Sequence, residues 1–523
     1  DPTTGVKVFT SPLVRIFVLF LIVLIMIMYV ASSIAGASMQ LTNVVVAFSM
    51  LGIILLCAAF VGSVGWGNVK GTVSAMPVVQ KFFKLRQSDY VKAMFIVVFS
   101  PLLPFVLVLS AVNQMTRKCL DITKTLTSED RHLILTLFFH NALKNMRQWR
   151  WSSVLRKAVT LGFVYFVIVV GIGKITQLFL AWLNITLSES GLSIWSISGI
   201  VFVVGIILFL IPAVPGVPIY LCCGVTLVAA GEPHFGSFAY AVLWATFVGY
   251  VCKLAGCTVQ QKLIGEGMGR SVRVRTACYV NSDPIKAFRL VCSDKGLMSF
   301  QLCVLLVGGP DWPVSVMAGI LRQPILKMLL GTTPILVPIA TTVVAGGCLL
   351  KANEAPMWAT LAGVFSTCAA LMFSGASIGF AIVLERVTTN RKVELDAIPN
   401  DEQVAKLERM QEKKQQIMDE VTEWRVVPFL FKMIIILGVI FMWCATMVFA
   451  LSGDESFYEV NLTTDYRKPP LNGDMTNIII RPLGLIGCAL EALALLCYML
   501  FSFYASTQAK SKLRMVDLDA LPP

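Results

Sequence analysis

The sequence predicts an all-α polytopic membrane protein with about eight transmembrane helices and two opposed re-entrant hairpins, each broken by proline and glycine. Apolar residues make up 57% of the 523-residue chain and charged residues only 14%, whereas a soluble domain of this size needs a more charged surface. Several windows exceed the roughly 20 apolar residues that cross a bilayer. Two further apolar stretches are interrupted near their middle, which an ordinary spanning helix is not.

Eight apolar windows predict the spanning helices. They are residues 12–34, 43–66, 158–183, 237–257, 325–350, 356–384, 428–451 and 478–506. Each is long enough to cross the hydrocarbon core of a bilayer.

The charge of the connecting loops assigns the sides of these helices. Segments 67–92, 113–157 and 253–299 carry a clear excess of Lys and Arg, which places them in the cytosol. Segment 452–477 has five acidic residues against two basic ones, which places it in the lumen. Both chain termini are then expected in the cytosol. The net charge of +13 is explained by these loops and does not indicate a nucleic-acid partner.

The chemistry-bearing residues exclude several classes of protein. Fourteen cysteines and three histidines include no pair with zinc-site spacing, and most of the cysteines lie in or beside apolar spans. Neither a metal, a disulfide framework nor another cofactor is expected. A P-loop, a convincing nucleophile–base set and paired acids at a membrane surface are also missing, so no enzyme is predicted. Because the chain begins with Asp1, further sequence is expected to precede it.

The first hairpin is predicted at about residues 196–231 and the second at about 300–322. Their breaks carry Pro212, Pro215, Gly216 and Pro218 in the first, and Gly308, Gly309, Pro310, Asp311 and Pro313 in the second. Prolines remove backbone donors, and unpaired backbone groups exposed to lipid cost several kcal/mol each. Each break is therefore expected to be covered by protein or solvated in a cavity.

The charge of the flanking loops predicts that the two hairpins enter the membrane from opposite faces. Their tips are therefore predicted to meet near the midplane. Transporters built from inverted repeats place their sites at such a point. Asp311 is the first candidate residue there, because an ionisable group at membrane depth is expensive and usually functional. The alternative is that Asp311 caps the returning half-helix of the second hairpin.

Lys253 and Glu232 are candidates for a polar path beside the hairpins. Lys253 lies at the cytosolic end of the predicted span 237–257, where its side chain could instead reach the membrane surface. Glu232 follows the first hairpin on the lumenal side, where simple solvation is the alternative.

Two sequons, at Asn184 and Asn461, fall in segments assigned to the lumen. Asn461 is expected to be the better acceptor of a glycan, because Asn184 lies close to the end of its helix and to the membrane.

These features divide the chain into four segments. Residues 1–157 hold two spans, a short hairpin and an interfacial helix, 158–385 hold the two broken hairpins, 386–427 form a cytosolic helical linker, and 428–523 form a two-span unit with a lumenal loop and a cytosolic tail.

Two features of the cytosolic segments suggest a protein partner. Residues 401–425 predict a soluble helix, which either bridges two spans in solvent or docks a cytosolic protein. The segment Val393–Pro399 recurs as Val516–Pro522, either as a repeated docking motif or as the relic of a duplication.

The run Phe209-Leu-Ile-Pro-Ala-Val-Pro-Gly-Val-Pro218, followed by Gly308–Pro313 and by Ala318-Gly-Ile-Leu-Arg-Gln-Pro324, resembles the VTT domain of the DedA/SNARE-associated Golgi protein superfamily. The resemblance covers about residues 158–385. It implies two facing re-entrant hairpins and a scramblase or transporter of membrane phospholipids in the endoplasmic reticulum or Golgi.

The chain departs from the bacterial members of that family in the charged positions. Where the bacterial members have a carboxylate after the first Pro-Gly, this chain has Val217. At the positions of two arginines in their second hairpin it has Leu305 and Asp311, and a third arginine is retained as Arg322. Without the arginines, a phosphate group loses its paired charge-assisted hydrogen bonds, which argues against carriage of an anionic lipid. A proton-coupled solute carrier with Asp311 as relay and a non-transporting scaffold are the alternatives to lipid movement.

Overall fold

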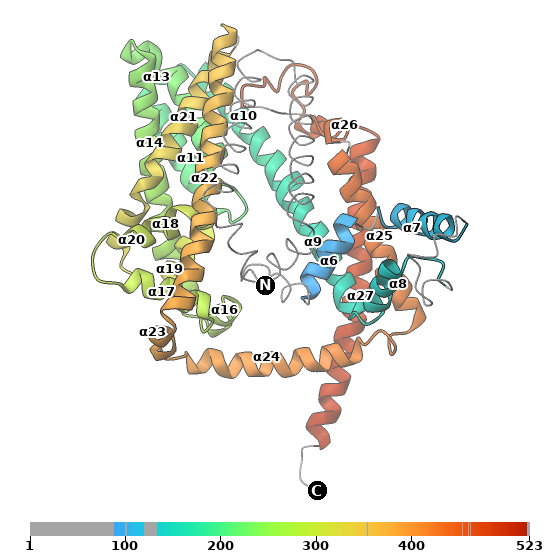
Figure 1. Ribbon diagram of the computed structural model, residues 1–523. Helices are drawn as coiled ribbons and strands as arrows, with labels where there is room; N and C mark the ends of the chain where they lie inside the picture. The colour runs from blue at the N-terminus through green and yellow to red at the C-terminus, as the bar shows by residue number, and fades with distance from the viewer. Residues whose placement is uncertain are drawn as a thin grey trace. The chain divides into compact units, whose positions relative to one another are not determined.

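The computed structural model describes residues 88–99, 102–119, 133–352, 354–451, 453–458, 460 and 462–519 (Figure 1). The predicted spans 12–34 and 43–66 lie outside the described residues. Within the described part the chain is helical, apart from one isolated bridge between Phe457 and Ile479.

Seven of the described helices are long and apolar enough to cross a membrane, judged by length and composition. They are Trp151–Glu189, Gly216–Phe235, Phe238–Met268, Ile325–Leu350, Pro356–Asn390, Phe429–Phe449 and Leu483–Arg514. Six of them coincide with predicted spans, and the remaining one, Gly216–Phe235, is the second arm of the first predicted hairpin. The protein is thus an all-α integral membrane protein.

The chain forms two compact units. Of the described residues, those within 172–411 and 460–476 form unit 1, and those within 88–171, 412–459 and 477–519 form unit 2. This division differs from the four predicted segments, because the N-terminal and C-terminal segments contribute helices to the same unit.

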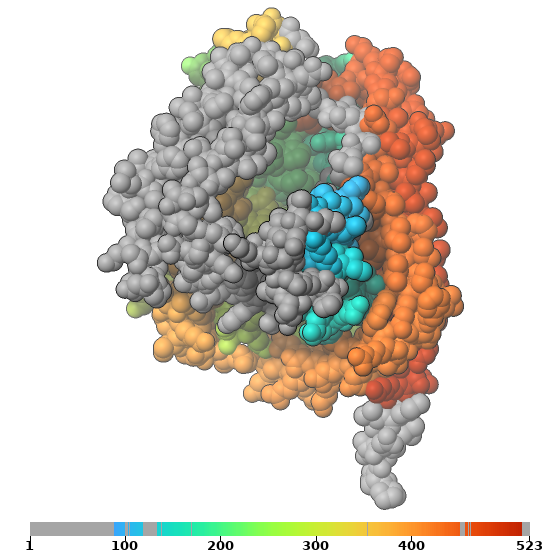
Figure 2. Space-filling model, turned by 45° about the vertical axis from the view of Figure 1, so that its right-hand side comes forward, coloured from blue at the N-terminus to red at the C-terminus, as the bar shows by residue number. Residues whose placement is uncertain are grey.

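Unit 2 is built on three packed helices. α9 (Trp151–Tyr165) packs against α25 (Phe429–Leu451) and α27 (Leu483–Asp519), and α25 runs along α27 (Figure 1 and Figure 2). Its other elements are α6 (Asp89–Phe99), α7 (Leu102–Cys119), α8 (Leu137–Arg147), most of the π-helix η3 (Phe166–Gly173) and α26 (Gly453–Ser456). A buried cluster that includes Ala158, Met442, Ala494 and Phe501 joins the three main helices.

Unit 1 contains both proline–glycine breaks. The first break separates α11 (Ile194–Leu210) from a continuous arm made of α12 (Gly216–Cys222), the π-helix η4 (Cys223–Leu227) and α13 (Val228–Phe235). The second break separates α18 (Phe300–Gly308) from α19 (Asp311–Ile320).

The remaining helices of unit 1 frame these breaks. They are α10 (Lys174–Glu189), α14 (Phe238–Val259), η5 (Gln260–Gly265), α15 (Glu266–Met268), α16 (Val272–Ala277), α17 (Asp283–Ser293), α20 (Ile325–Thr332), η6 (Thr333–Ile335), α21 (Leu336–Leu350), α22 (Pro356–Asn390) and α23 (Lys392–Ala397). α24 (Glu402–Val421) begins in unit 1 and continues into unit 2.

The two broken hairpins are unequal in length. The arms of the second, α18 and α19, have 9 and 10 residues, which at 1.5 Å per residue gives about 14 and 15 Å, half of a bilayer core. The arms of the first have 17 and 20 residues, or about 26 and 30 Å. Each arm of the first hairpin is therefore close to the full thickness of the hydrocarbon core.

Glycines allow close packing at two helix crossings. At each crossing, the arm after one break packs against the spanning helix that follows the other break. A Cβ on Gly224 in η4 would overlap the carbonyl of Val343 in α21, and one on Gly319 in α19 would overlap the carbonyl of Gln261 in η5. Opposite these two glycines lie Gly346 and Gly265, so each crossing is glycine on glycine. The absence of side chains lets the helix backbones approach closely, as small residues do in membrane helices.

Candidate functional site

The two breaks of unit 1 meet at Gly216 and Asp311. Gly216 begins α12 directly after the first break, and Asp311 begins α19 directly after the second. A Cβ on Gly216 would lie only 2.9 Å from Oδ2 of Asp311. The carboxylate therefore lies close to the glycine backbone, in the space that a side chain would occupy. A side chain at position 216 would displace the Asp311 carboxylate from this contact.

Asp311 forms a buried ion pair with Lys253 of α14. The Lys253 Nζ lies 2.8 Å from Oδ1 of Asp311, and the lysine side chain is 2% exposed while that of the aspartate is 28% exposed. Lys253 is the central residue of the 31-residue helix Phe238–Met268, about 22 Å from either end. The alternative that the Lys253 side chain reaches the surface is wrong, because the side chain is buried against Asp311. The helix also continues past residue 257 through η5.

Asp311 does not cap α19. Pro310 occupies the N-cap position and no side-chain hydrogen bond is made there. The carboxylate is directed to Lys253 instead, while its place in the first turn still suits the positive end of the helix dipole.

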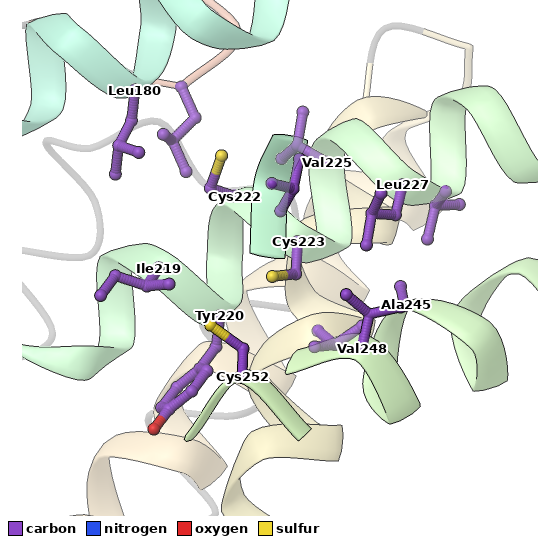
Figure 3. Packing of buried hydrophobic residues seen from close by; sticks show 14 of the residues in the cluster. Leu180, Ile219, Tyr220, Cys222, Cys223, Val225, Leu227, Ala245, Val248 and Cys252 are labelled. Atoms are coloured by element: carbon purple, nitrogen blue, oxygen red, sulfur yellow. The ribbon is translucent and has the colours of Figure 1, made fainter. Parts of the chain in front are cut away.

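Two aromatic residues surround the ion pair. The Lys253 Nζ lies 5.2 Å from the centroid of the Phe209 ring, within the range of a cation–π interaction. Tyr220 packs against the same ring at 5.9 Å and is 1% exposed. Figure 3 shows the Tyr220 hydroxyl pointing away from the apolar cluster around Cys222 and Cys223.

The Tyr220 hydroxyl has no hydrogen-bond partner among the described residues, although it is buried. It lies 3.1 Å from the position of a Cβ on Gly216, beside the ion pair. A buried hydroxyl without a partner costs about 1–3 kcal/mol.

Two adjacent glutamines of η5 hydrogen-bond to backbone carbonyls of two other segments. From η5, Gln260 Nε2 donates to the carbonyl of Phe209 at 2.6 Å, and Gln261 Nε2 donates to the carbonyl of Gln323 at 2.7 Å. The first carbonyl lies just before the first break and the second lies just after α19. Sequence analysis missed both residues, although two neighbouring amides at the end of an apolar helix are the signal that could have identified them. π-Helices such as η5 are frequent at functional sites.

The predicted prolines begin the helices that follow the breaks. Pro215 and Pro310 are the N-cap residues of α12 and α19, and Pro218 and Pro313 lie in the first turns of these helices. A missing N–H is tolerated there, because first-turn donors have no partner within the helix. Pro212 lies in the turn of the first break.

The glycines of the second break have a packing role. A Cβ on Gly308 would overlap the carbonyl of Ala376 in α22, and a Cβ on Gly309 would lie 2.8 Å from the carbonyl oxygen of Leu305. The end of α18 is thereby held directly against α22.

Glu232 belongs to a different ion pair. Its Oε1 lies 2.7 Å from the Lys351 Nζ, which in turn lies 5.4 Å from the ring centroid of Phe238. The hydrogen bond to Glu232 raises the pKa of Lys351. Because Phe238 begins α14, this pair lies about 22 Å along the helix from Lys253. Lys253 and Glu232 therefore belong to separate ion pairs.

Arg322 lies at the opposite end of α19 from Asp311. It follows that helix with a positive φ of 53° and lines a separate cavity with residues of α17 and of the loop before α24. It therefore makes no part of the Lys253–Asp311 site.

Asn184 is not available for glycosylation. It is 8% exposed, its Nδ2 donates to the carbonyl of Leu462 at 3.1 Å, and its Oδ1 accepts from the Thr226 hydroxyl at 3.0 Å. Its prediction as an acceptor is wrong, because the amide nitrogen faces a packed interior. Asn461 lies outside the described residues.

The two copies of the acidic–apolar motif adopt different structures. In the copy Val393–Pro399, α23 buries Leu395 at 1% exposure in a cluster with α17, α18 and α22. The copy Val516–Pro522 continues α27 as far as Asp519 and then leaves the described residues. α24, within the predicted helix 401–425, has Val404 as its buried residue, as expected of a mostly solvated helix.

Comparisons with models of known protein families, with curated proteins and with solved structures give no match.

Proposed function

We propose that this protein moves phospholipids between the two leaflets of a membrane, and that the Lys253–Asp311 pair contacts the lipid headgroup during passage. The observation that carries the proposal is an ion pair between Lys253, buried at the middle of an apolar helix, and Asp311, at the point where two helix breaks meet. Ionisable groups at such depth are costly, and they are usually retained for a pathway. The glycine crossings add support, because each packs the arm after one break on the spanning helix after the other break. Transporters with inverted repeats hold their sites between such elements.

The charges of the pair suit a zwitterionic headgroup. Lys253 offers a cation for the lipid phosphate, and Asp311 offers an anion for the lipid ammonium group. Opening a buried pair by itself leaves two unpaired charges, whereas a zwitterionic headgroup can replace both partners. The 28% exposure of Asp311 provides an open side, and the Tyr220 hydroxyl supplies a further donor.

We further propose that the protein works in the endoplasmic reticulum or Golgi with both termini in the cytosol. The basic loops between the spans favour this orientation. Passage of a headgroup between leaflets requires neither a cofactor nor covalent chemistry, so an enzymatic role is not part of the proposal.

The test is lipid scrambling by the full-length protein in vesicles that contain a fluorescent phosphatidylcholine, read as the fraction that dithionite quenches. Asp311→Asn alone would leave Lys253 buried without a counter-charge, so the test uses the double variant Lys253→Met/Asp311→Leu. Such apolar replacement of a buried ion pair is often neutral for stability. We expect this variant to fold and to scramble at the rate of protein-free vesicles.

The matched control is Lys351→Met/Glu232→Gln, which removes the other ion pair of unit 1 and should keep the wild-type rate. Wild-type rates for the Lys253→Met/Asp311→Leu variant would contradict the role of the pair. Wild-type protein that does not scramble at all would contradict the function. In that case pH-dependent uptake of a solute would support a carrier. The absence of both activities would support a scaffold.

A further inference from the structure

A second polar site lies in unit 1, where α16, α17, α19 and α23 gather (Figure 1). It is a cavity of about 290 Å³. Its charged lining consists of Arg275, Lys286, Arg289, Arg322 and Asp401. Four cations therefore face a single carboxylate.

Two of the four cations are held by the chain and two are not. The Arg275 Nε lies 2.8 Å from Oδ2 of Asp401, and the Lys286 Nζ donates to the carbonyl of Ile398 at 3.1 Å. Arg289 and Arg322 are exposed and have no ion-pair or hydrogen-bond partner for their side chains among the described residues. The cavity thus keeps two guanidinium groups ready for an anion.

The backbone at Arg322 is in a conformation that glycine adopts more readily. Its φ is 53°, in the left-handed region that side chains disfavour. Its N–H donates to the carbonyl of Gly319, and the N–H of Gln323 donates to the carbonyl of Ala318. These two bonds form a Schellman motif, whose left-handed position is usually glycine. An arginine at that position suggests that the guanidinium is needed there.

We propose that this cavity binds a phosphate-bearing anion between Arg289 and Arg322. The planar guanidinium groups match phosphate oxygens in pairs of charge-assisted hydrogen bonds. The volume is close to the lower limit of about 300 Å³ for small-molecule sites, which suits a single phosphorylated headgroup. The phosphate can belong to a soluble organic phosphate or to the headgroup of an anionic phospholipid.

Binding at this cavity would connect two elements of unit 1. Arg322 directly follows α19, and Asp401 caps α24 by accepting hydrogen bonds from the N–H groups of Gln403 and Val404. An anion on Arg322 would therefore link the end of the second broken hairpin to the loop that starts α24. The proposal does not depend on lipid transport, because its readout is equilibrium binding.

The experiment measures binding to full-length protein in detergent by titration calorimetry and by the shift in melting temperature. The probes are inositol 1,4,5-trisphosphate for the soluble source, and mixed micelles of phosphatidic acid, compared with phosphatidylcholine, for the lipid source. We expect at least one phosphate probe to bind wild type, and Arg289→Ala and Arg322→Gly each to weaken it by about tenfold or more. Arg386→Ala removes an exposed arginine of α22 outside the cavity and should bind as wild type.

Arg322→Gly also separates a ligand role from a structural one. Without ligand this variant should melt at a higher temperature than wild type, since glycine suits the left-handed conformation. A lower melting temperature would mean that the side chain stabilises the fold, and would overturn the assignment of Arg322.

Binding of the trisphosphate alone would identify a soluble ligand, and binding of phosphatidic acid alone would identify a lipid. Each result supports the site. Failure of both probes to bind wild type, or equal affinity in wild type and both cavity variants, would overturn the proposal.

Discussion

At the scale of single residues, Asp89 of unit 2 and Asp311 of unit 1 differ in the number of their charged partners. In unit 2 the carboxylate of Asp89 is fully buried and lies 2.7 Å from Arg150 Nη2, 2.7 Å from the Ser153 hydroxyl and 3.4 Å from Lys157 Nζ. In unit 1 a single lysine compensates Asp311. A carboxylate with several cationic partners is suited to hold helices together. One with a single partner and an open side is better suited to exchange that partner for a ligand.

Asp89 gives a pH-dependent prediction for unit 2. Burial raises the pKa of its carboxyl, but the hydrogen bond from Ser153 and the charges of Arg150, Lys157 and Lys92 together lower it below its usual 3.8. Because the pKa is lower in the folded than in the unfolded state, the ionised carboxylate stabilises the fold fully at pH values above the unfolded-state pKa. This contribution is lost as the pH falls through the folded-state pKa. Asp89→Asn should therefore lower the free energy of unfolding by about 3 kcal/mol at pH 7.

The difference between wild type and Asp89→Asn should stay constant from about pH 8 to 5 and shrink below about pH 4. Detergent-solubilised protein unfolded at a series of pH values provides the measurement. Glu394→Gln, which removes a largely exposed carboxylate, is the control and should leave stability almost unchanged. A difference for Asp89→Asn that grows on acidification would contradict the assignment.

At the scale of elements, context decides the structure of similar segments. The copy Val393–Pro399 contains a short packed helix, whereas the described part of the related copy, 516–519, continues a long one. The two broken hairpins likewise differ, since the first has arms about twice as long as the second. What they share is the way in which the arm after each break packs, glycine against glycine, on a spanning helix.

The glycine crossings give a prediction for helix packing. In Gly224→Ala the new methyl group would meet the backbone of Val343, which cannot rotate away as a side chain can. We expect a loss of about 2–3 kcal/mol in the free energy of unfolding, measured as a lower melting temperature in detergent. Gly319→Ala should behave similarly at the other crossing.

Gly363→Ala in α22 is the matched control, because no atom lies within 4 Å of its added Cβ. It should leave the melting temperature unchanged or raise it slightly, since alanine favours the helix. Equal stability of Gly224→Ala and Gly363→Ala would mean that the crossing is not tightly packed.

At the scale of the whole molecule, loop charge and the sequons predict how the chain crosses the membrane. With 452–477 in the lumen, Asn461 is expected to carry a glycan. The Asn184 side chain hydrogen-bonds to the Thr226 hydroxyl and to the Leu462 carbonyl inside unit 1, so it is expected to carry no glycan.

Glycosidase treatment of protein from a secretory host tests this topology. The mass shift should disappear in Asn461→Gln and persist in Asn184→Gln. Asn184→Gln should instead lower stability by about 1–3 kcal/mol, because buried hydrogen-bonding groups lose their partners. A glycan on Asn184, or cleavage of 452–477 by protease added to the cytosolic side of sealed vesicles, would refute the proposed topology.

The sequence by itself determined the all-α membrane class, six spanning helices of the described part and the positions of both breaks. Helix length, apolar composition and proline chemistry are local properties that a window of residues contains. The sequence also identified Asp311 as the residue to examine, because an acid within an apolar stretch is conspicuous.

Only the tertiary structure decided which groups meet. Lys253 was expected to reach a surface because the polar residues after 257 resemble a loop, although Gln260 and Gln261 continue the helix and hydrogen-bond to the carbonyls of Phe209 and Gln323. The pairing of Asp311 with Lys253 and its contact with Gly216 join segments far apart in the chain. Ion pairs and close backbone contacts depend on distances of a few ångströms, and a single sequence does not encode such distances in any local pattern.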